Sequence, residues 1–268
     1  MADLAKLHRI SAFLDELADA SAAAIRPLFR SALSVDNKLD GGRFDPVTAA
    51  DRAAEVEMRK LIAEAYPDHG ILGEEFGEHQ TDAEYIWVLD PIDGTRAFIS
   101  GLPTWATLIG LTENGHPALG VMNQPFTGER FAGDTRHAWY HGPDGARDLK
   151  VRSCASLSEA VMLTTTPALF SAHERPVYDA IEADVRLARY GTDCYGYAMV
   201  AAGQVDLVIE SGLKPYDIVA LIPIIEGAGG MVTNWTGGSA AHGGQIVATG
   251  DKRLHEIVLK RLASAATG

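Results

Sequence analysis

Residues 85–95 read YIWVLDPIDGT, in which an apolar run is followed at once by two aspartates. The apolar run over 85–89 predicts a buried strand. Carboxylates at the end of such a strand are costly unless a cation compensates them. Asp90, Asp93 and the carbonyl of Ile92 are close enough in sequence to converge on one hard cation such as Mg²⁺, which prefers oxygen ligands. The segment therefore predicts a cation site at the end of a strand.

The next two residues add features that suit an anion. Gly94 permits close backbone approach, and Thr95 offers a hydroxyl group. Their N–H groups precede an expected short helix over 95–99 and are suited to hold a phosphate. Taken alone, Asp-Pro and Asp-Gly pairs are also common in plain turns, and Asp caps helices. The other acidic segments of the chain favour the functional interpretation.

Three further acidic clusters lie where strands or helices are expected to begin or end. They are Gly73–Glu75, Asp45–Asp51 and Asp217. The first follows a short apolar pair, and the last follows Lys214-Pro215-Tyr216 and opens a helix. The presence of Glu74, Glu75 and the distant Asp217 favours a functional site at Asp90–Thr95 over a plain turn.

Two helices are expected first and then a series of strands, and in the last third strands and helices alternate, which indicates a mixed α/β architecture. Thr48 and Asp51, three residues apart, form a capping box at the start of a helix. Helices are expected at 4–29, 49–65, 174–188, 195–202, 217–227 and 252–262. Strands are expected at 85–89, 105–111, 119–122, 129–132, 161–165, 205–209, 231–234 and 246–248.

Composition narrows the class of protein. With 268 residues and 47% apolar residues, the chain can bury a sizeable core. A net charge of −13 argues against nucleic acid or an anionic membrane as partner. Cys154 and Cys194 form no CxxC pair, which argues against a thiolate zinc site. With no spanning apolar run and no secretory signal, a soluble cytoplasmic enzyme is expected.

In its four acidic segments the chain resembles the inositol monophosphatase family of magnesium-dependent, lithium-sensitive phosphatases. The segments are Asp45–Asp51, Gly73–Glu75, Asp90–Thr95 and Glu210–Asp217, the last followed by 226–230. The resemblance implies an α+β or α/β fold built as a layered α/β/α/β/α sandwich, assembled as a homodimer. One catalytic unit would comprise an N-terminal subdomain, 1–145, with most metal ligands, and a C-terminal subdomain, 146–268, with Asp217 and the substrate contacts.

The resemblance also implies roles for individual residues. Two or three Mg²⁺ ions per subunit would be bound by Glu74, Asp90, Ile92, Asp93 and Asp217. The catalytic residues that position and activate the attacking water would be Glu74 and Thr95, with Asp51 supporting Thr95. The substrate-binding residues would be Asp93, Gly94, Thr95, Arg189, Asp193, Glu210 and Asp217. Arg189 also suits a plain surface cation, and Lys38 lies in the loop that completes the site in this family.

Within the family, the segments Asp90–Trp105, Asp193–Tyr197 and Gly212–Asp217 resemble the histidinol-phosphate phosphatase branch. The substrate of that branch, in histidine biosynthesis, carries an ammonium and an imidazole group. Asp193 and Glu210 would offer these groups negative partners. Two alternatives stay open: an inositol-1-phosphate or sugar-phosphate phosphatase, and a non-catalytic regulatory protein on the same fold. The complete set of carboxylate ligands favours an enzyme that hydrolyses a small phosphate monoester.

Overall fold

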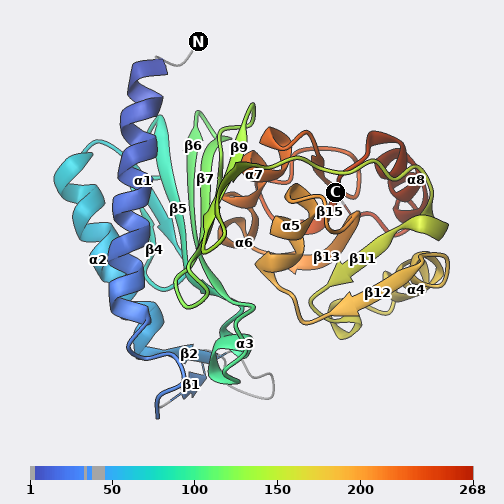
Figure 1. Ribbon diagram of the computed structural model, residues 1–268, viewed down its shortest axis with the longest axis horizontal. Helices are drawn as coiled ribbons and strands as arrows, with labels where there is room; N and C mark the ends of the chain where they lie inside the picture. Colours follow the sequence, from blue (N-terminus) through green and yellow to red (C-terminus); the bar gives the residue numbers. More distant parts are fainter. Residues whose placement is uncertain (1–3, 33–34, 38–45, 268) are drawn as a thin grey trace.

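The computed structural model describes residues 4–32, 35–37 and 46–267 (Figure 1). The helices are α1 (Leu4–Ile25), α2 (Ala49–Ala65), α3 (Thr95–Ile99), α4 (Arg175–Glu182), α5 (Cys194–Ala201), α6 (Pro215–Ile218), α7 (Leu221–Gly227) and α8 (Lys252–Leu262). The strands of the first half are β1 (Val35–Asn37), β2 (Pro46–Thr48), β3 (Gly70–Gly73), β4 (Gly77–His79), β5 (Tyr85–Asp93), β6 (Ala106–Glu113), β7 (His116–Gln124), β8 (Glu129–Gly133), β9 (Ala138–Gly142) and β10 (Gly145–Asp148). Those of the second half are β11 (Val161–Thr164), β12 (Leu187–Tyr190), β13 (Leu207–Leu213), β14 (Met231–Asn234) and β15 (Gly244–Thr249).

Within the described residues, the strands form two large mixed sheets and a short β1–β2 ladder. The first sheet has eight strands in the order β10-β9-β8-β7-β6-β5-β3-β4, antiparallel except for the parallel pair β3–β5. The second has five in the order β12-β11-β13-β15-β14, and β11 runs parallel to both of its neighbours. Because β3 and β5 are parallel, their carboxyl ends lie at the same end of the first sheet. The acidic residues that end β5 and follow β3 are therefore close together.

The two sheets and three sets of helices form five layers (Figure 1). The helices α1 and α2 cover the outer face of the first sheet, α5, α6 and α7 lie between the sheets, and α4 and α8 cover the second sheet from outside. Separate apolar clusters fill the spaces between these layers, and the largest joins the middle helices to both sheets. The predicted layered α/β/α/β/α sandwich is confirmed.

Three predicted helices have different bounds in the structure. The first ends at Ile25 rather than at residue 29, because Pro27 lacks an N–H and disfavours helix at the residue before it. The helix expected over 174–188 stops at Glu182, since the chain then forms β12 beside β11. The helix expected over 217–227 is split into α6 and α7, and Pro223 fits only because it lies in the first turn of α7.

The strand β5 runs four residues further than expected, through the Asp-Pro-Ile-Asp segment to Asp93. It stays paired with β6, but the register shifts between Asp90 and Asp93, which marks an irregularity of the β-bulge type. Pro91 lies inside this shift, where a missing N–H costs no ladder hydrogen bond. The shift in register changes the direction of the Asp93 side chain relative to that of Asp90, compared with a regular strand.

The capping box predicted at the start of α2 is confirmed. The Thr48 N–H donates to Asp51 Oδ2 at 2.8 Å, and the Ala50 N–H donates to Thr48 Oγ1 at 3.1 Å. The acidic segment Asp45–Asp51 is only partly visible, because Asp45 lies outside the described residues, as does Lys38.

The chain passes from the first sheet to the second between β10 and β11. The division into subdomains 1–145 and 146–268 stays a proposal. Among the described residues, none of the helices combines the length and the apolar character that crossing a membrane requires.

Candidate active site

Three carboxylates meet where the first sheet faces the middle layer of helices. Asp90 and Asp93 come from the end of β5, and Asp217 comes from α6. Each offers a ligand atom, and these atoms all lie within 4.8 Å of one another. The structure thus brings together three of the residues that the sequence suggested as metal ligands.

Hydrogen bonds hold the backbone between the two aspartates in place. The Ile92 N–H donates to Asp90 Oδ1 at 3.0 Å, and the Thr107 hydroxyl donates to the Pro91 carbonyl at 2.8 Å. Thr107 is itself buried and lies 2.9 Å from the Ser21 hydroxyl on α1. The irregular end of β5 is therefore a bonded, fixed structure rather than a loose turn.

The electrostatics of this cluster favour a cation. Burial raises the pKa of both Asp90 and Asp93 well above the usual range, and the charges of neighbouring carboxylates raise it further. Such carboxylates repel one another unless protons or a cation neutralise them. A hard divalent cation such as Mg²⁺ takes this type of oxygen ligand. The residues present therefore fit a magnesium site.

Glu74 is placed beside Asp90 by the parallel pairing of β3 with β5. Gly73 pairs with Leu89, and the Glu74 N–H donates to the Leu89 carbonyl at 3.1 Å. The Glu74 carboxylate is also among the charges that raise the pKa of Asp90. Glu74 thus joins the carboxylate cluster from the neighbouring strand.

Gly94 and Thr95 follow β5 directly and open α3. Gly94 has φ +82°, and a Cβ atom there would lie 3.1 Å from Asp193 Oδ2, so glycine meets both a conformational and a steric need. The Thr95 hydroxyl donates to the Ile92 carbonyl at 3.1 Å. Thr95 is thus hydrogen-bonded to Ile92, a predicted metal ligand, and lies two residues after Asp93, another predicted ligand.

Asp51 is fully buried at the start of α2. Its Oδ2 accepts from the Thr48 N–H and, at 2.6 Å, from the Thr48 hydroxyl. Its Oδ1 is buried with no hydrogen-bond partner among the described residues. Burial raises the pKa of Asp51, and the charge of Glu74 adds to the effect. Asp51 was predicted to support Thr95, but the hydrogen bonds of its Oδ2 come from Thr48. The Thr95 hydroxyl donates to the Ile92 carbonyl instead.

The start of α5 connects the second half of the chain to β5. The Cys194 N–H donates to Asp93 Oδ2 at 2.8 Å. The preceding residue, Asp193, has φ 44° and ψ −136°, a conformation that side-chain-bearing residues rarely adopt. Burial raises the pKa of its carboxyl group. Backbone strain of this kind is concentrated at functional sites, and Asp193 lies against Gly94.

Glu210 lies on β13, beneath the same region, and is 1% exposed. Its Oε1 accepts from the Thr165 N–H at 2.5 Å, while its Oε2 is buried with no hydrogen-bond partner within the described part of the chain. Burial raises the pKa of Glu210 to about 8.

A cavity of 490 Å³ opens beside the cluster. It is lined by Asp93, Gly94, Thr95, Arg96, Ala97, Ser100, Leu102, Thr165, Thr166, Leu169, Gly191, Asp193, Leu213 and Asp217. Its walls come from both halves of the chain. Arg189 is not part of the lining; it is exposed on the edge strand β12.

Sequence reasoning missed several residues of this cavity. Thr165 and Thr166 directly follow β11, at the end where the strands of the second sheet approach the cluster. The position of Thr165 and Thr166, directly after an apolar strand, is a feature of the sequence from which they could have been predicted. Leu102 and Leu169 form an exposed apolar part of the wall, for which the sequence offers no comparable signal.

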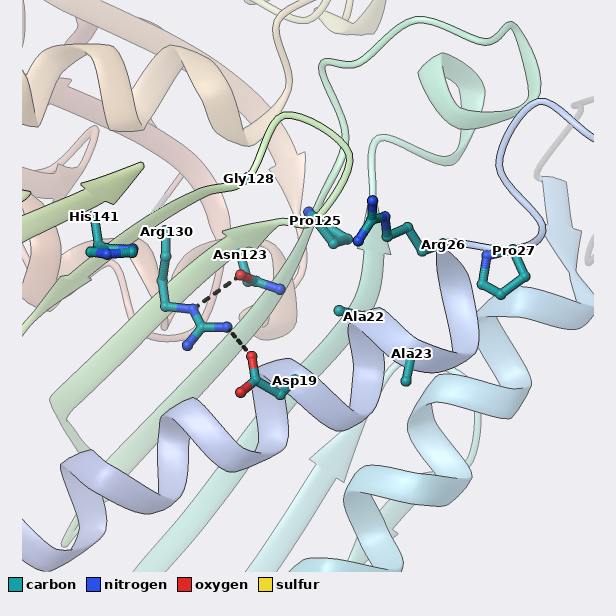
Figure 2. A pocket seen from close by; sticks show the side chains of 10 residues that line it. All are labelled: Asp19, Ala22, Ala23, Arg26, Pro27, Asn123, Pro125, Gly128, Arg130 and His141. Atoms are coloured by element: carbon teal, nitrogen blue, oxygen red, sulfur yellow. Dashed lines mark hydrogen bonds and ion pairs between the residues drawn. The ribbon is translucent and has the colours of Figure 1, made fainter. Parts of the chain in front are cut away.

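A second hollow, of 760 Å³, lies between α1 and the β7–β8 turn (Figure 2). Arg130 lies in it, bonded to Asn123 at 3.0 Å and to Asp19 at 2.6 Å. None of the residues suggested as catalytic or metal-binding lines this hollow. The cavity beside the carboxylate cluster is therefore the candidate active site.

Known proteins resemble this chain in sequence and in fold. The sequence matches the inositol monophosphatase family over residues 6–266. The bifunctional phosphatase IMPL2 of Arabidopsis thaliana, named as chloroplastic, is 44% identical over 96% of this chain and 76% of its own length. A histidinol-phosphatase of Mycobacterium tuberculosis is 37% identical over 86% of this chain and 88% of its own length. The solved structure of an inositol monophosphatase from Zymomonas mobilis is 42% identical, with a TM-score of 0.82 and coverage of 93% of this chain and 95% of that one.

Proposed function

The chain belongs to the inositol monophosphatase family, and we propose that it is a Mg²⁺-dependent phosphatase that hydrolyses L-histidinol phosphate to L-histidinol and phosphate. Phosphatase activity on a small phosphate monoester follows from the family. The choice of substrate is supported by a relative named histidinol-phosphatase. The observation that supports it is a pair of carboxylates near Gly94. Asp193 is half-buried and lines the cavity, and Glu210 is buried behind Thr165, which lines it.

The residues that would hold two or three Mg²⁺ ions are Glu74, Asp90, Ile92 through its carbonyl, Asp93 and Asp217. Bound there, Mg²⁺ supplies positive charge to the phosphate oxygens and lowers the pKa of a coordinated water. The protein contributes a rigid carboxylate frame, because the backbone from Asp90 to Asp93 is held by hydrogen bonds on both sides.

The phosphate group would be bound by Gly94 and Thr95 through their backbone N–H groups. Glu74 and the Thr95 hydroxyl would orient the attacking water, and Glu74 would accept its proton. Asp51, whose Oδ1 has no partner among the residues described, would stabilise this arrangement. Geometry of this kind accelerates hydrolysis by fixing the water in line with the leaving oxygen.

This mechanism needs no covalent intermediate on the enzyme. The nearest thiol, Cys194, is buried, and burial raises its pKa well above the usual range. A thiol that stays protonated is a poor nucleophile. Direct attack by water on phosphorus therefore suits this site better.

Recognition of the leaving group would come from Asp193 and from Glu210, which would release its proton to solvent on pairing with the cation, because burial raises its pKa to about 8. Histidinol carries an ammonium and an imidazole, and a charge-assisted hydrogen bond to a carboxylate contributes about 1.5–3 kcal/mol. Inositol offers only neutral hydroxyl groups. The proposed carboxylates would thus favour the cationic substrate by roughly one to two powers of ten.

A second candidate substrate is inositol-1-phosphate or a related sugar phosphate. The observation that favours it is the likeness to the inositol monophosphatase of Zymomonas mobilis. Because the phosphate-binding residues are common to both proposals, only the leaving-group side distinguishes them.

The decisive experiment is a phosphate-release assay with histidinol phosphate, inositol-1-phosphate and p-nitrophenyl phosphate. EDTA is expected to abolish activity on all three, and Mg²⁺ to restore it. We expect the highest kcat/KM for histidinol phosphate. Preference for inositol-1-phosphate would refute the substrate and leave the phosphatase proposal in place, whereas full activity without metal would refute the metal-dependent mechanism.

The homodimer, the place in histidine biosynthesis and the cytoplasmic location stay proposals. Sedimentation equilibrium with and without Mg²⁺ tests the dimer. Growth without histidine, in a strain that lacks this activity and carries this chain, tests the pathway.

A further inference from the structure

The turn that carries Glu74 lies at an exposed edge of the first sheet. It connects β3 to β4, and β4 is the last strand of the sheet on that side. The two strands pair through Gly73 and Gly77, so that Glu74, Glu75 and Phe76 form the turn between them. Edge turns have few neighbours to hold them, yet the proposed chemistry requires the Glu74 carboxylate to stand at a fixed position.

One side chain of α2 binds the backbone of this turn. Glu55 is 0% exposed, and its Oε2 accepts from the Glu75 N–H at 2.8 Å. Its Oε1 accepts from the Phe76 N–H at 3.2 Å. The two amides directly after Glu74 are therefore both bonded to a single buried carboxylate.

Arg59, one helical turn later, completes the arrangement. Its Nε donates to Glu55 Oε1 at 2.7 Å, and its Nη2 donates to the Gly77 carbonyl. A Cβ atom on Gly73 would lie 1.9 Å from Glu55 Oε1, so the strand leaves space for this carboxylate. The Glu55–Arg59 pair is thus hydrogen-bonded to the backbone of the three residues after Glu74 and lies against Gly73 before it.

Glu55 lies where an apolar residue is expected. It falls on the same stripe of α2 as Met58 and Ile62, both of which are fully buried. A buried charge costs folding free energy, and an apolar side chain of similar size would often serve stability as well or better. A carboxylate at this position therefore points to a role other than filling the core.

We propose that Glu55 and Arg59 are positioning residues that hold Glu74 in the geometry needed to bind the metal ion and orient the attacking water. Neither touches the substrate; both act through the backbone of the turn. The inference rests on the proposed metal-dependent function and extends it to residues outside the cavity. Loss of an outer partner of this kind typically costs about 10–100-fold in metal affinity or activity.

The test compares Glu55→Gln with a matched control elsewhere in the chain. The control is Asp206→Asn, because Asp206 is likewise buried, accepts from the Arg152 guanidinium and accepts from a backbone N–H, that of Val161. Asp206 lies in the second sheet region and lines no part of the cavity. Circular dichroism and the thermal midpoint establish that each variant is folded and how far it is destabilised.

Metal binding is measured directly from the electron paramagnetic resonance signal of free Mn²⁺, without substrate. We expect Glu55→Gln to raise the Mn²⁺ dissociation constant by about tenfold or more and to lower kcat at saturating Mg²⁺ similarly. The KM for p-nitrophenyl phosphate should change by less than about twofold. Asp206→Asn should lower the thermal midpoint while leaving Mn²⁺ affinity and kcat unchanged.

Two further variants keep the test decisive if Glu55→Gln does not fold. Arg59→Met removes the hydrogen bond to Gly77. Gly73→Ala displaces the Glu55 carboxylate but leaves Glu55 and Arg59 unchanged in the sequence. Each is expected to weaken Mn²⁺ binding in the same direction.

The outcomes separate this inference from the proposed function. Wild-type Mn²⁺ affinity in folded Glu55→Gln, or an equal loss in Asp206→Asn, would overturn the positioning role alone. Mn²⁺ binding that persists unchanged in Asp93→Asn would overturn the metal site itself, and the positioning role with it.

Discussion

Replacement of Asp193 separates backbone strain from substrate recognition. Its φ of 44° and ψ of −136° belong to a region that glycine adopts freely and other residues do not. Such a conformation costs about 1–3 kcal/mol. Asp193→Gly should remove this strain, less about 0.5–1 kcal/mol for the greater freedom of glycine in the unfolded chain. Asp193→Ala removes the same carboxylate and retains the strain.

The two variants should therefore differ in stability but not in chemistry. We expect Asp193→Gly to be more stable than Asp193→Ala by about 1 kcal/mol, which in a chain of this length is about 2 °C in Tm. Thermal unfolding in EDTA measures this difference without any contribution from bound metal. Both variants should lose roughly one to two powers of ten in kcat/KM for histidinol phosphate and little for p-nitrophenyl phosphate.

Backbone strain at Asp193 and recognition of the leaving group would be refuted by different results. Equal Tm values for the glycine and alanine variants would show that the backbone at Asp193 carries no strain. Equal losses of activity on both substrates would show that Asp193 shapes the site without contacting the leaving group.

Other predictions concern the metal site, a buried histidine and a packed glycine. Asp93→Asn should nearly eliminate phosphate release, because it removes a ligand charge, and a normal circular dichroism spectrum would show that the fold is intact. Burial lowers the pKa of His255 to about 4, so proton uptake by this ring in the unfolded chain should lower the free energy of unfolding by about 3 kcal/mol as the pH falls from 6.5 to 4. Urea unfolding at several pH values should show a smaller pH dependence in His255→Gln. Gly120→Ala would place a Cβ atom 1.9 Å from the Ala220 carbonyl oxygen, and we expect a loss of about 1–3 kcal/mol in urea unfolding.

Features that depend on residues close together in sequence could be predicted. The capping box needs only Thr48 and Asp51, and the structure contains it. The meeting of Asp90 with Asp93 follows from their spacing at the end of an apolar strand. That Asp217 joins them came from the resemblance to a family, since no local rule connects residues so far apart.

Features that depend on contacts between distant segments were missed or placed wrongly. The helix predicted over 174–188 extends into the first two residues of β12, which owes its form to pairing with β11 that the local sequence does not encode. The contact of Glu55 with the turn after Glu74 is of the same kind. A signal was present, since a glutamate on the buried stripe of an amphipathic helix needs a partner, but the sequence alone does not name that partner.

The carboxylate cluster has a consequence for the way the protein acquires its stability. Asp93 is bonded to Cys194, 101 residues later, so the site is complete only when both halves of the chain have folded together. Folding without a cation requires these buried carboxylates either to take up protons or to repel one another, whereas a bound cation would attract them. With the proposed metal bound there, the free energy of the native state would be thermodynamically linked to the concentration of free divalent metal. Depletion of magnesium would lower the population of folded chains as well as their turnover, and a nascent or truncated chain that ends before Asp217 would lack part of that stabilisation.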